Sequence, residues 1–141
     1  PDRETPALTG VTSVEKKTGG KAPPLRERLV HAIIEQGYEA ASPLIAEARS
    51  VFPDSLLFDE NVLNWLGYHF LYWWGRTRDA VGVFTLMTEV FPASFNAHDS
   101  LGEAWMMAGN REKAIFHYER SLELNPDNNN AVEQLRLLKG E

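Results

Sequence analysis

A spacing of 34 residues between helix-ending residues constrains the fold of this chain more than any other feature of its sequence. This interval separates Pro92 from Pro126, and it also separates Gly75 from Gly109. Within the intervening segments, the same interval relates Ala80 to Ala114 and Phe84 to Tyr118. Self-similarity of this period is typical of proteins whose repeating unit is a helix pair that stacks on its neighbours. The spacing therefore predicts a stack of antiparallel helical hairpins.

Apolar residues recur every three or four positions from Leu25 onward, which indicates a series of amphipathic helices. We predict seven helices, and six of them end at a glycine or before a proline, namely Gly37, Pro53, Gly75, Pro92, Gly109 and Pro126. The last helix contains Ala131, Leu135 and Leu138. No segment alternates apolar and polar residues over the length of a strand, so the predicted fold class is all-α.

The repeats differ in length. Leu66 precedes Leu101 by 35 residues, so the helix that contains Leu66 holds one extra residue. Pro53 precedes Pro92 by 39 residues, which leaves four extra residues before Leu66. A weaker first copy begins near Leu29. These spacings predict about three hairpin units followed by a helix that seals the end of the stack.

Residues 95–126 resemble a tetratricopeptide repeat. The residues at the signature positions of that family are Leu101, Gly102, Trp105, Ala114, Tyr118 and Pro126, whereas His98 and Ser121 stand where the family often has Trp and usually Ala. The resemblance is strongest in this third copy, weaker in the second copy, which contains Leu66, and weakest in the first, which begins near Leu29. Together the three copies cover about four-fifths of the chain. The resemblance implies antiparallel hairpin repeats stacked as a short right-handed superhelix over residues 25–141, with about three units and a capping helix.

The residue types at these positions have physical reasons. Gly102 and Ala114 are small, as expected where the two helices of one hairpin cross closely. Tyr118 is large enough to fill the space between helices. Gly109 can end one helix and Asn110 can cap the next. We therefore expect Gly102 to lie at a tight helix crossing.

Residues 1–24 differ in composition from the rest of the chain, since they contain four prolines, a pair of adjacent glycines and few large apolar side chains. Such a segment cannot bury enough surface to offset its ordering entropy. We expect a flexible linker, or an arm that docks on a neighbouring domain. Residues 29–141 carry sixteen acidic and eight basic side chains. This acidic part disfavours nucleic acid and anionic membrane surfaces as partners.

The sequence contains no constellation typical of an enzyme. It has no cysteine, which removes thiolate metal sites and a cysteine nucleophile. None of the four histidines stands in a metal-ligand spacing, and no serine lies in the Gly-x-Ser-x-Gly context of a nucleophile. No apolar run is long enough to span a bilayer. We expect no catalytic residue, no cofactor, no metal and no membrane insertion, and both cytoplasm and periplasm are compatible with this sequence.

Two segments, 58–68 and 91–104, also resemble the helical tail of many bacterial serine hydrolases of the β-lactamase and penicillin-binding type. This resemblance covers roughly residues 55–138 and includes no catalytic motif, so it carries over no activity. The chain begins at Pro1 without a methionine, as a fragment or a processed product would. The resemblance implies an appendage of a larger hydrolase.

The run from Tyr68 to Trp74 consists almost entirely of aromatic side chains. A helix cannot bury so many consecutive large side chains against one neighbour. We predict that Phe70, Leu71 and Trp74 pack in the core. Two alternatives stay open for Tyr68, Tyr72 and Trp73. These side chains either fill the core or lie at a binding or domain interface.

Repeats of the resembled family bind partners through an inner surface made by the first helix of each pair. The residues that alignment to the signature places on this open surface are Glu27, His31, Glu35, Asn64, Tyr68, Tyr72, Asp99, Glu103, Met106 and Met107. The set lacks the Lys, Asn and Arg residues with which related chaperone adaptors hold a terminal carboxylate. Its aromatic and acidic side chains favour a protein partner with apolar and basic residues.

Three functions are compatible with these patterns. The first is an interaction module docked on its own upstream hydrolase domain, which the N-terminal segment and the hydrolase resemblance favour. The second is a free-standing adaptor for another protein, for which a more regular first repeat is expected. The third is a small-ligand or catalytic site among the aromatic residues, which needs a convergent polar set beside them that the sequence does not show.

Overall fold

The computed structural model describes residues 24–141, which fall into two compact units. The described part of the first unit is residues 24–58, and the second unit is residues 59–141. All seven predicted helices are present in residues 24–141 and no strand occurs there, which confirms the all-α fold class. The segment predicted to be a linker or arm lies outside the described residues apart from Pro24.

The first unit is one helical hairpin followed by a short turn. Helix α2 (Leu25–Gln36) packs on α3 (Tyr38–Val51), and the 3-10 turn η1 (Leu56–Phe58) comes after them. Only Gly37 separates the two helices, and its φ of 85° is a conformation that other residues rarely adopt. The apolar residues buried in these helices are Leu29, Ala32, Ile33, Ala41, Ile45 and Ala48.

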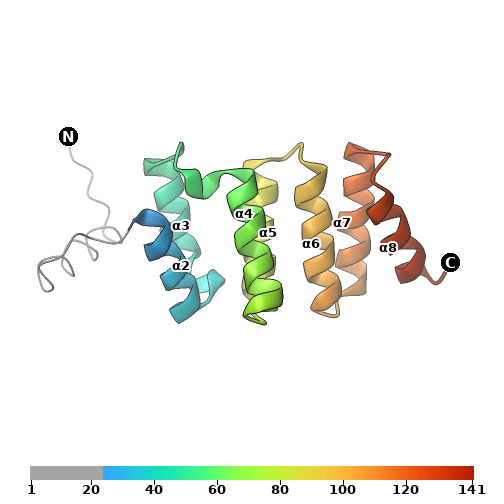
Figure 1. The fold of residues 1–141 in the computed structure, drawn as a ribbon, viewed down its shortest axis with the longest axis horizontal. Helices are drawn as coiled ribbons and strands as arrows, with labels where there is room; N and C mark the ends of the chain where they lie inside the picture. Colours follow the sequence, from blue (N-terminus) through green and yellow to red (C-terminus); the bar gives the residue numbers. More distant parts are fainter. Residues whose placement is uncertain (1–23) are drawn as a thin grey trace, which may run out of the picture. The chain divides into compact units, whose positions relative to one another are not determined.

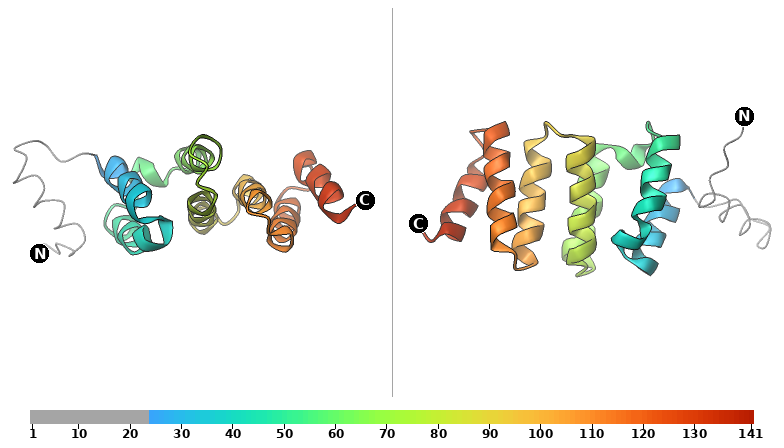
Figure 2. Two further views of the ribbon diagram at one scale, coloured as in Figure 1. Left: turned by 90° about the horizontal axis from the view of Figure 1, so that it is seen from below. Right: turned by 180° about the vertical axis from the view of Figure 1, so that it is seen from behind.

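The second unit contains the two more regular repeats. Its α-helices are α4 (Glu60–Tyr68), α5 (Thr77–Val90), α6 (Phe95–Met107), α7 (Arg111–Leu124) and α8 (Asn129–Lys139). Each of these helices packs on the next one in the chain (Figure 1). Seen from its edge, the unit has α4, α6 and α8 in one layer and α5 and α7 in a second (Figure 2). The first helices of the hairpins therefore share one face of this unit.

Polar side chains at the helix starts explain why the helices begin where they do. Asp59 caps α4, because its Oδ1 accepts a hydrogen bond from the backbone N–H of Asn61 at 2.9 Å. Asn110 caps α7 by accepting from the N–H of Lys113 at 3.1 Å, which confirms the predicted cap. Gly109, with a φ of 79°, ends the turn before it. Ser94 and Asn128 cap α6 and α8 in the same way.

Two glycines allow the helices of each hairpin to cross closely. A Cβ atom at Gly67 would lie 2.3 Å from the Phe84 ring, and one at Gly102 would lie 3.1 Å from the Tyr118 ring. Phe84 is fully buried, and Tyr118 is buried with only 1% of its surface exposed. The prediction of a tight crossing at Gly102 is confirmed, and the crossing at Gly67 is tighter still.

The extra residue in the helix after Asp59 is absorbed by a π-helical turn. Residues His69–Trp73 form this turn, η2, directly after α4. The N–H of Trp74 donates to the carbonyl of His69, five residues earlier, at 3.1 Å. A π turn holds one more residue than the corresponding α turn. Equivalent residues of the two repeats are therefore 35 positions apart before η2, as Leu66 and Leu101 are, and 34 positions apart after it, as Gly75 and Gly109 are.

The π turn also corrects one prediction about the core. Phe70 and Leu71 are buried as predicted, but the prediction for Trp74 is wrong because 45% of its surface is exposed. The helix ends at Trp74, and the widened turn carries its ring out of the core. The Trp74 ring still packs edge-on against the buried Phe70 ring, with centroids 5.0 Å apart.

Candidate protein-binding face

Glu103 on α6 receives hydrogen bonds from two tyrosines of the preceding first helix. Tyr68 donates from its hydroxyl to Glu103 Oε2 at 2.7 Å, and Tyr72 donates to Glu103 Oε1. The two tyrosine rings are stacked, with centroids 6.0 Å apart and planes 5° from parallel. One carboxylate thus joins α4 and η2 to α6 across two neighbouring repeats.

A buried serine extends this network toward the start of α4. Ser100 is fully buried and donates from its hydroxyl to Asn64 Oδ1 at 2.9 Å. The Tyr68 hydroxyl lies 3.2 Å from the same serine oxygen. Ser100 was not among the predicted site residues, although it stands three positions before Glu103 and therefore on the same side of the helix.

The network strengthens the preference of both tyrosines for the protonated form. Burial raises the pKa of Tyr68 above its ordinary value, and the neighbouring Glu103 carboxylate adds to this rise. Burial and the hydrogen bond to Glu103 raise the pKa of Tyr72 to about 12. Both hydroxyls therefore act as neutral donors to the carboxylate.

Asp99 on α6 belongs to a separate network with the start of α8. Asn128 donates from Nδ2 to Asp99 Oδ2 at 2.8 Å. Asn130 donates from Nδ2 to Asp99 Oδ1 at 3.0 Å. The amide of Asn128 also donates to Ser121 Oγ at 2.9 Å. This carboxylate therefore positions the last helix of the unit.

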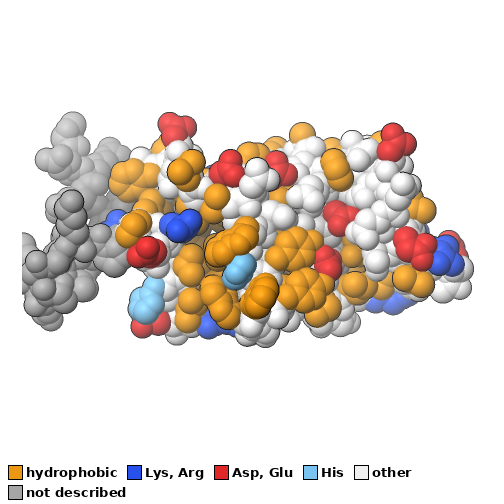
Figure 3. Space-filling view, viewed as in Figure 1, with side chains coloured by type: hydrophobic (Ala, Val, Ile, Leu, Met, Phe, Trp, Pro, Cys, Tyr) orange, Lys and Arg blue, Asp and Glu red, His pale blue; other side chains and the backbone are white. Residues whose placement is uncertain are grey.

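A second set of aromatic side chains lies on another flank of α4 and η2. We define the aromatic flank as Trp65, His69, Trp73 and Trp74. The His69 ring packs against Trp65 with centroids 3.7 Å apart, and against Trp73 and Trp74 at 6.0 and 5.7 Å. Figure 3 shows hydrophobic side chains gathered around a histidine over α4 and η2.

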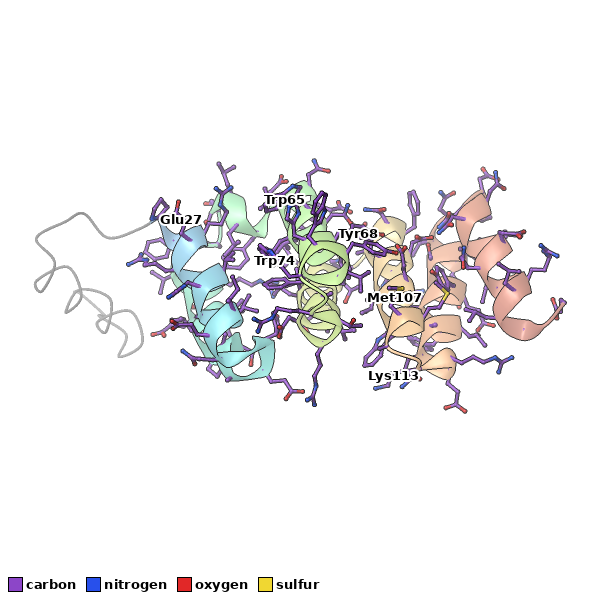
Figure 4. All side chains as sticks on the ribbon, turned by 60° about the horizontal axis from the view of Figure 1, so that its bottom comes forward. Glu27, Trp65, Tyr68, Trp74, Met107 and Lys113 are labelled. Atoms are coloured by element: carbon purple, nitrogen blue, oxygen red, sulfur yellow. The ribbon has the colours of Figure 1, made fainter. Side chains whose placement is uncertain are left out.

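The aromatic flank is distinct from the tyrosine network. In Figure 4, Tyr68 extends from α4 toward α6, whereas Trp65 and Trp74 do not lie on that side. The indole of Trp73 is the most open of the set, with 78% of its surface exposed. The spacing of four residues from Trp65 to His69 and from His69 to Trp73 is visible in the sequence, but the predicted inner surface included none of them, and only Trp73 was named as a possible interface residue.

The structure brings together only some of the predicted site residues. Four of them lie in one network, namely Asn64, Tyr68, Tyr72 and Glu103. Asp99 lies in its separate network with α8. Met106 is half-buried against the core cluster of α7 and α8, and Met107 is half-exposed. The remaining three are on α2 in the first unit, namely Glu27, His31 and Glu35. The binding role of all these residues stays a prediction.

Within residues 24–141, no group of three or more His, Cys, Asp or Glu side chains is arranged to hold a metal ion. Over the same range, every helix is too short or too polar to cross a membrane.

Comparisons with known proteins agree with the helical-repeat architecture. The sequence profile of the tetratricopeptide repeat matches residues 95–128. Among solved structures, the chain is similar to the first tetratricopeptide domain of Spaghetti (RPAP3) bound to the HSP90 peptide SRMEEVD. The TM-score is 0.56 at 20% identity, over 82% of this chain and 88% of that one. It is also similar to the first such domain of human RPAP3, with the same TM-score and identity, over 82% and 87% of the two chains. No curated protein matches the chain. At this level of identity the likeness to solved structures shows the fold alone.

Proposed function

We propose that this chain is a protein-interaction module without catalytic activity of its own. It binds a partner segment with apolar and basic side chains along α4, η2 and α6. The observation that carries the proposal is the Glu103 carboxylate held between Tyr68 and Tyr72, because it places aromatic and acidic groups from two adjacent first helices on one face. Such groups are typical anchors of protein interfaces.

The charge of this face favours a basic partner. Residues 59–141 carry twelve acidic and seven basic side chains. A carboxylate offers about four lone-pair sites, and the two tyrosines use two of those at Glu103, so acceptor capacity remains. Tyr72 keeps 53% of its surface exposed, which leaves its ring available for contact.

The same charge argues against an acidic partner. The HSP90 peptide bound by the Spaghetti domain contains two glutamates and an aspartate in SRMEEVD. In this chain α6 contributes Asp99 and Glu103 to the proposed face, and these carboxylates would repel such a peptide. We therefore propose a specificity opposite in charge to that of the structurally similar domain.

A random peptide library displayed on phage provides the test. Peptides selected on the full chain are synthesised, and their binding is mapped from backbone amide chemical shifts. We expect the selected peptides to contain Lys or Arg beside apolar residues. We expect the shifts to cluster on α4, η2 and α6. Shifts confined to α5 and α7 would place the binding face elsewhere.

Substitutions sharpen this experiment. Glu103→Gln keeps the size of the side chain and an acceptor for a tyrosine, but it removes the charge. We expect it to weaken binding several-fold and to reduce the salt dependence of the affinity. Glu112→Gln, at an exposed position on α7, is the matched control and leaves affinity unchanged. Equal affinities for the two variants would contradict the proposal.

The hydrolase-tail resemblance of residues 55–138 supports a more specific version, in which the partner is a hydrolase domain of the same polypeptide. The alternative is a free-standing adaptor. A bacterial hydrolase domain of the β-lactamase type, supplied as a separate protein, distinguishes them. Saturable binding that Glu103→Gln weakens supports the appendage, and absence of binding favours the adaptor.

A further inference from the structure

We infer that the aromatic flank is a subsite for an arginine side chain of the partner segment, held by cation–π contact. This inference rests on the proposed function and names the chemistry of one anchor. The flank consists of three indoles and one imidazole from a single helix and its π turn. Its place is separate from the tyrosine network on the α6 side (Figure 4).

The geometry of the flank exposes ring surface rather than hiding it. The His69 ring packs against Trp65 with planes tilted by 36°, stacks on Trp73, and meets Trp74 edge-on with planes at 67°. The exposed fractions are 54% for Trp65, 78% for Trp73 and 45% for Trp74. The imidazole thus holds the three indoles as one patch, with much of their surface open to a ligand.

The chemistry of these rings selects a cation over an aliphatic group. Among the aromatic side chains, indole has the face most attractive to a cation. Residues 59–74 contain two acidic side chains and no Lys or Arg, so the helix that carries the flank adds no repelling charge of its own. The nearest basic residue in the sequence, Arg76, forms an ion pair with Asp79. Residues 59–141 as a whole carry twelve acidic and seven basic side chains, so the net charge of this unit is complementary to an arginine.

Two cation–π contacts already occur within residues 59–141. The ammonium of Lys113 lies 4.2 Å from the centroid of the Trp105 ring. The guanidinium of Arg76 lies 6.0 Å from the centroid of the Phe70 ring. An arginine suits the flank better than a lysine because its planar, weakly hydrated guanidinium stacks on aromatic faces.

A pair of peptide probes tests the inference on the full chain. One is an acetylated, amidated peptide of alternating glycine and arginine, and the other replaces each arginine with citrulline, its neutral isostere. Binding is followed through the indole N–H signals of the four tryptophans in two-dimensional NMR. We expect the arginine peptide to shift the signals of Trp65, Trp73 and Trp74 and to bind at least about threefold tighter than the citrulline peptide. Equal binding of the two peptides would show an apolar surface instead, and no saturable shift would also overturn the inference.

Substitutions at Trp73 separate ring electrostatics from apolar contact. Trp73→Phe keeps a weaker aromatic face, and Trp73→Leu keeps only apolar surface. For cation–π contact, affinity falls in the order wild type, Trp73→Phe, Trp73→Leu, with about a three- to tenfold total loss. Phe116→Leu removes an exposed ring on α7 and serves as the control, with no loss expected. Equal affinity of the two Trp73 variants would contradict the cation–π contact.

Failure of this inference is distinguishable from failure of the proposed function. If library peptides bind on α4, η2 and α6 but the arginine and citrulline probes bind alike, the interaction module stands and the arginine subsite is wrong. If library peptides bind elsewhere on the chain, the proposed face itself is wrong, whatever the probes do.

Discussion

The hairpins α4–α5 and α6–α7 share one pattern of packing residues, but each departs from it in a different place. Gly67 meets Phe84 in the first hairpin as Gly102 meets Tyr118 in the second. The first hairpin then carries an extra residue, which the π turn η2 absorbs at the end of its first helix. The second hairpin has regular helices throughout.

The second hairpin departs from the pattern inside the helix pair. Leu63 and Val83 are buried in α4–α5, and the repeat spacing places His98 and His117 at the corresponding positions of α6–α7. The two histidine Nδ1 atoms lie 3.2 Å apart, with the rings nearly parallel at 21°. A polar pair thus stands at the positions where the first hairpin has two buried aliphatic side chains.

The difference shows where a repeat tolerates change. An insertion at the helix end leaves Phe70 and Leu71 buried and places additional indole surface in solvent. A substitution between the helices is retained only if the polar groups find partners, as the two histidines do in each other. Function can therefore be added at the end of a repeat with less cost to stability than in its middle.

The largest expected effect concerns the two crossings. A Cβ at Gly67 would overlap the buried Phe84 ring, so Gly67→Ala should destabilise the fold by about 2 kcal/mol or more. Gly102→Ala meets the Tyr118 ring at 3.1–3.2 Å, and alanine gains about 1 kcal/mol over glycine in a helix. We expect a loss below about 1 kcal/mol there. Urea denaturation of both variants checks the ranking, which equal losses would contradict.

The next effect concerns Glu103. The sequence places it on an open surface, where replacement usually costs within about 0.5 kcal/mol. Because it is half-buried and accepts from two tyrosines, we expect Glu103→Leu to cost about 1.5 kcal/mol. The measurement is the midpoint of urea denaturation, with Glu112→Leu as the exposed control. In a Tyr68→Phe, Tyr72→Phe background, Glu103→Leu should lower the free energy of unfolding by less than it does in the wild type. An equal loss in both backgrounds would show that the hydrogen bonds from the two tyrosines to Glu103 do not stabilise the fold.

The histidine pair predicts a pH dependence of stability. Burial, followed by the charges of His98 and Lys113, lowers the pKa of His117 to about 4. Burial also lowers the pKa of His98, as does the charge of Arg120, whereas Glu123 opposes them. An unfolded histidine titrates near about 6.5, so between about pH 6.5 and 4 the unfolded state binds protons that the folded state does not.

The free energy of unfolding should therefore fall as the pH falls through that window, and this contribution is constant above it. Both rings are partly exposed, so solvent screening limits the effect to on the order of 1 kcal/mol. The double variant His98→Leu, His117→Val copies the α4–α5 hairpin. Thermal unfolding at several pH values should show a smaller slope for this variant than for wild type, and identical slopes would rule out the pair as the source.

The smallest expected effect concerns the exposed end of the π turn. Trp73 has 78% of its surface exposed, so Trp73→Leu should change the free energy of unfolding by no more than about 0.5 kcal/mol. Leu71→Ala, two residues earlier and buried, should cost about 2–5 kcal/mol by the same measurement. A large loss for Trp73→Leu would mean that the indole contributes to the fold rather than to a binding surface.

The sequence by itself determined the helices of this protein and their order. The 34-residue interval, the glycine and proline stops and the cap at Asn110 each depend on the chemistry of a few neighbouring residues, so they can be read locally. The close crossing at Gly102 was also predictable, because only a small residue fits where a large ring recurs at a fixed repeat position.

Only the tertiary structure decided how the side chains of different repeats meet. The sequence shows that the third helix holds one extra residue, but not that a π turn absorbs it and exposes Trp74. Tyr68 and Tyr72 reach Glu103 across 35 and 31 residues of chain, and His98 reaches His117 across 19. Such contacts depend on the rotation and crossing angle of packed helices, which helical periodicity does not specify to the precision of a hydrogen bond.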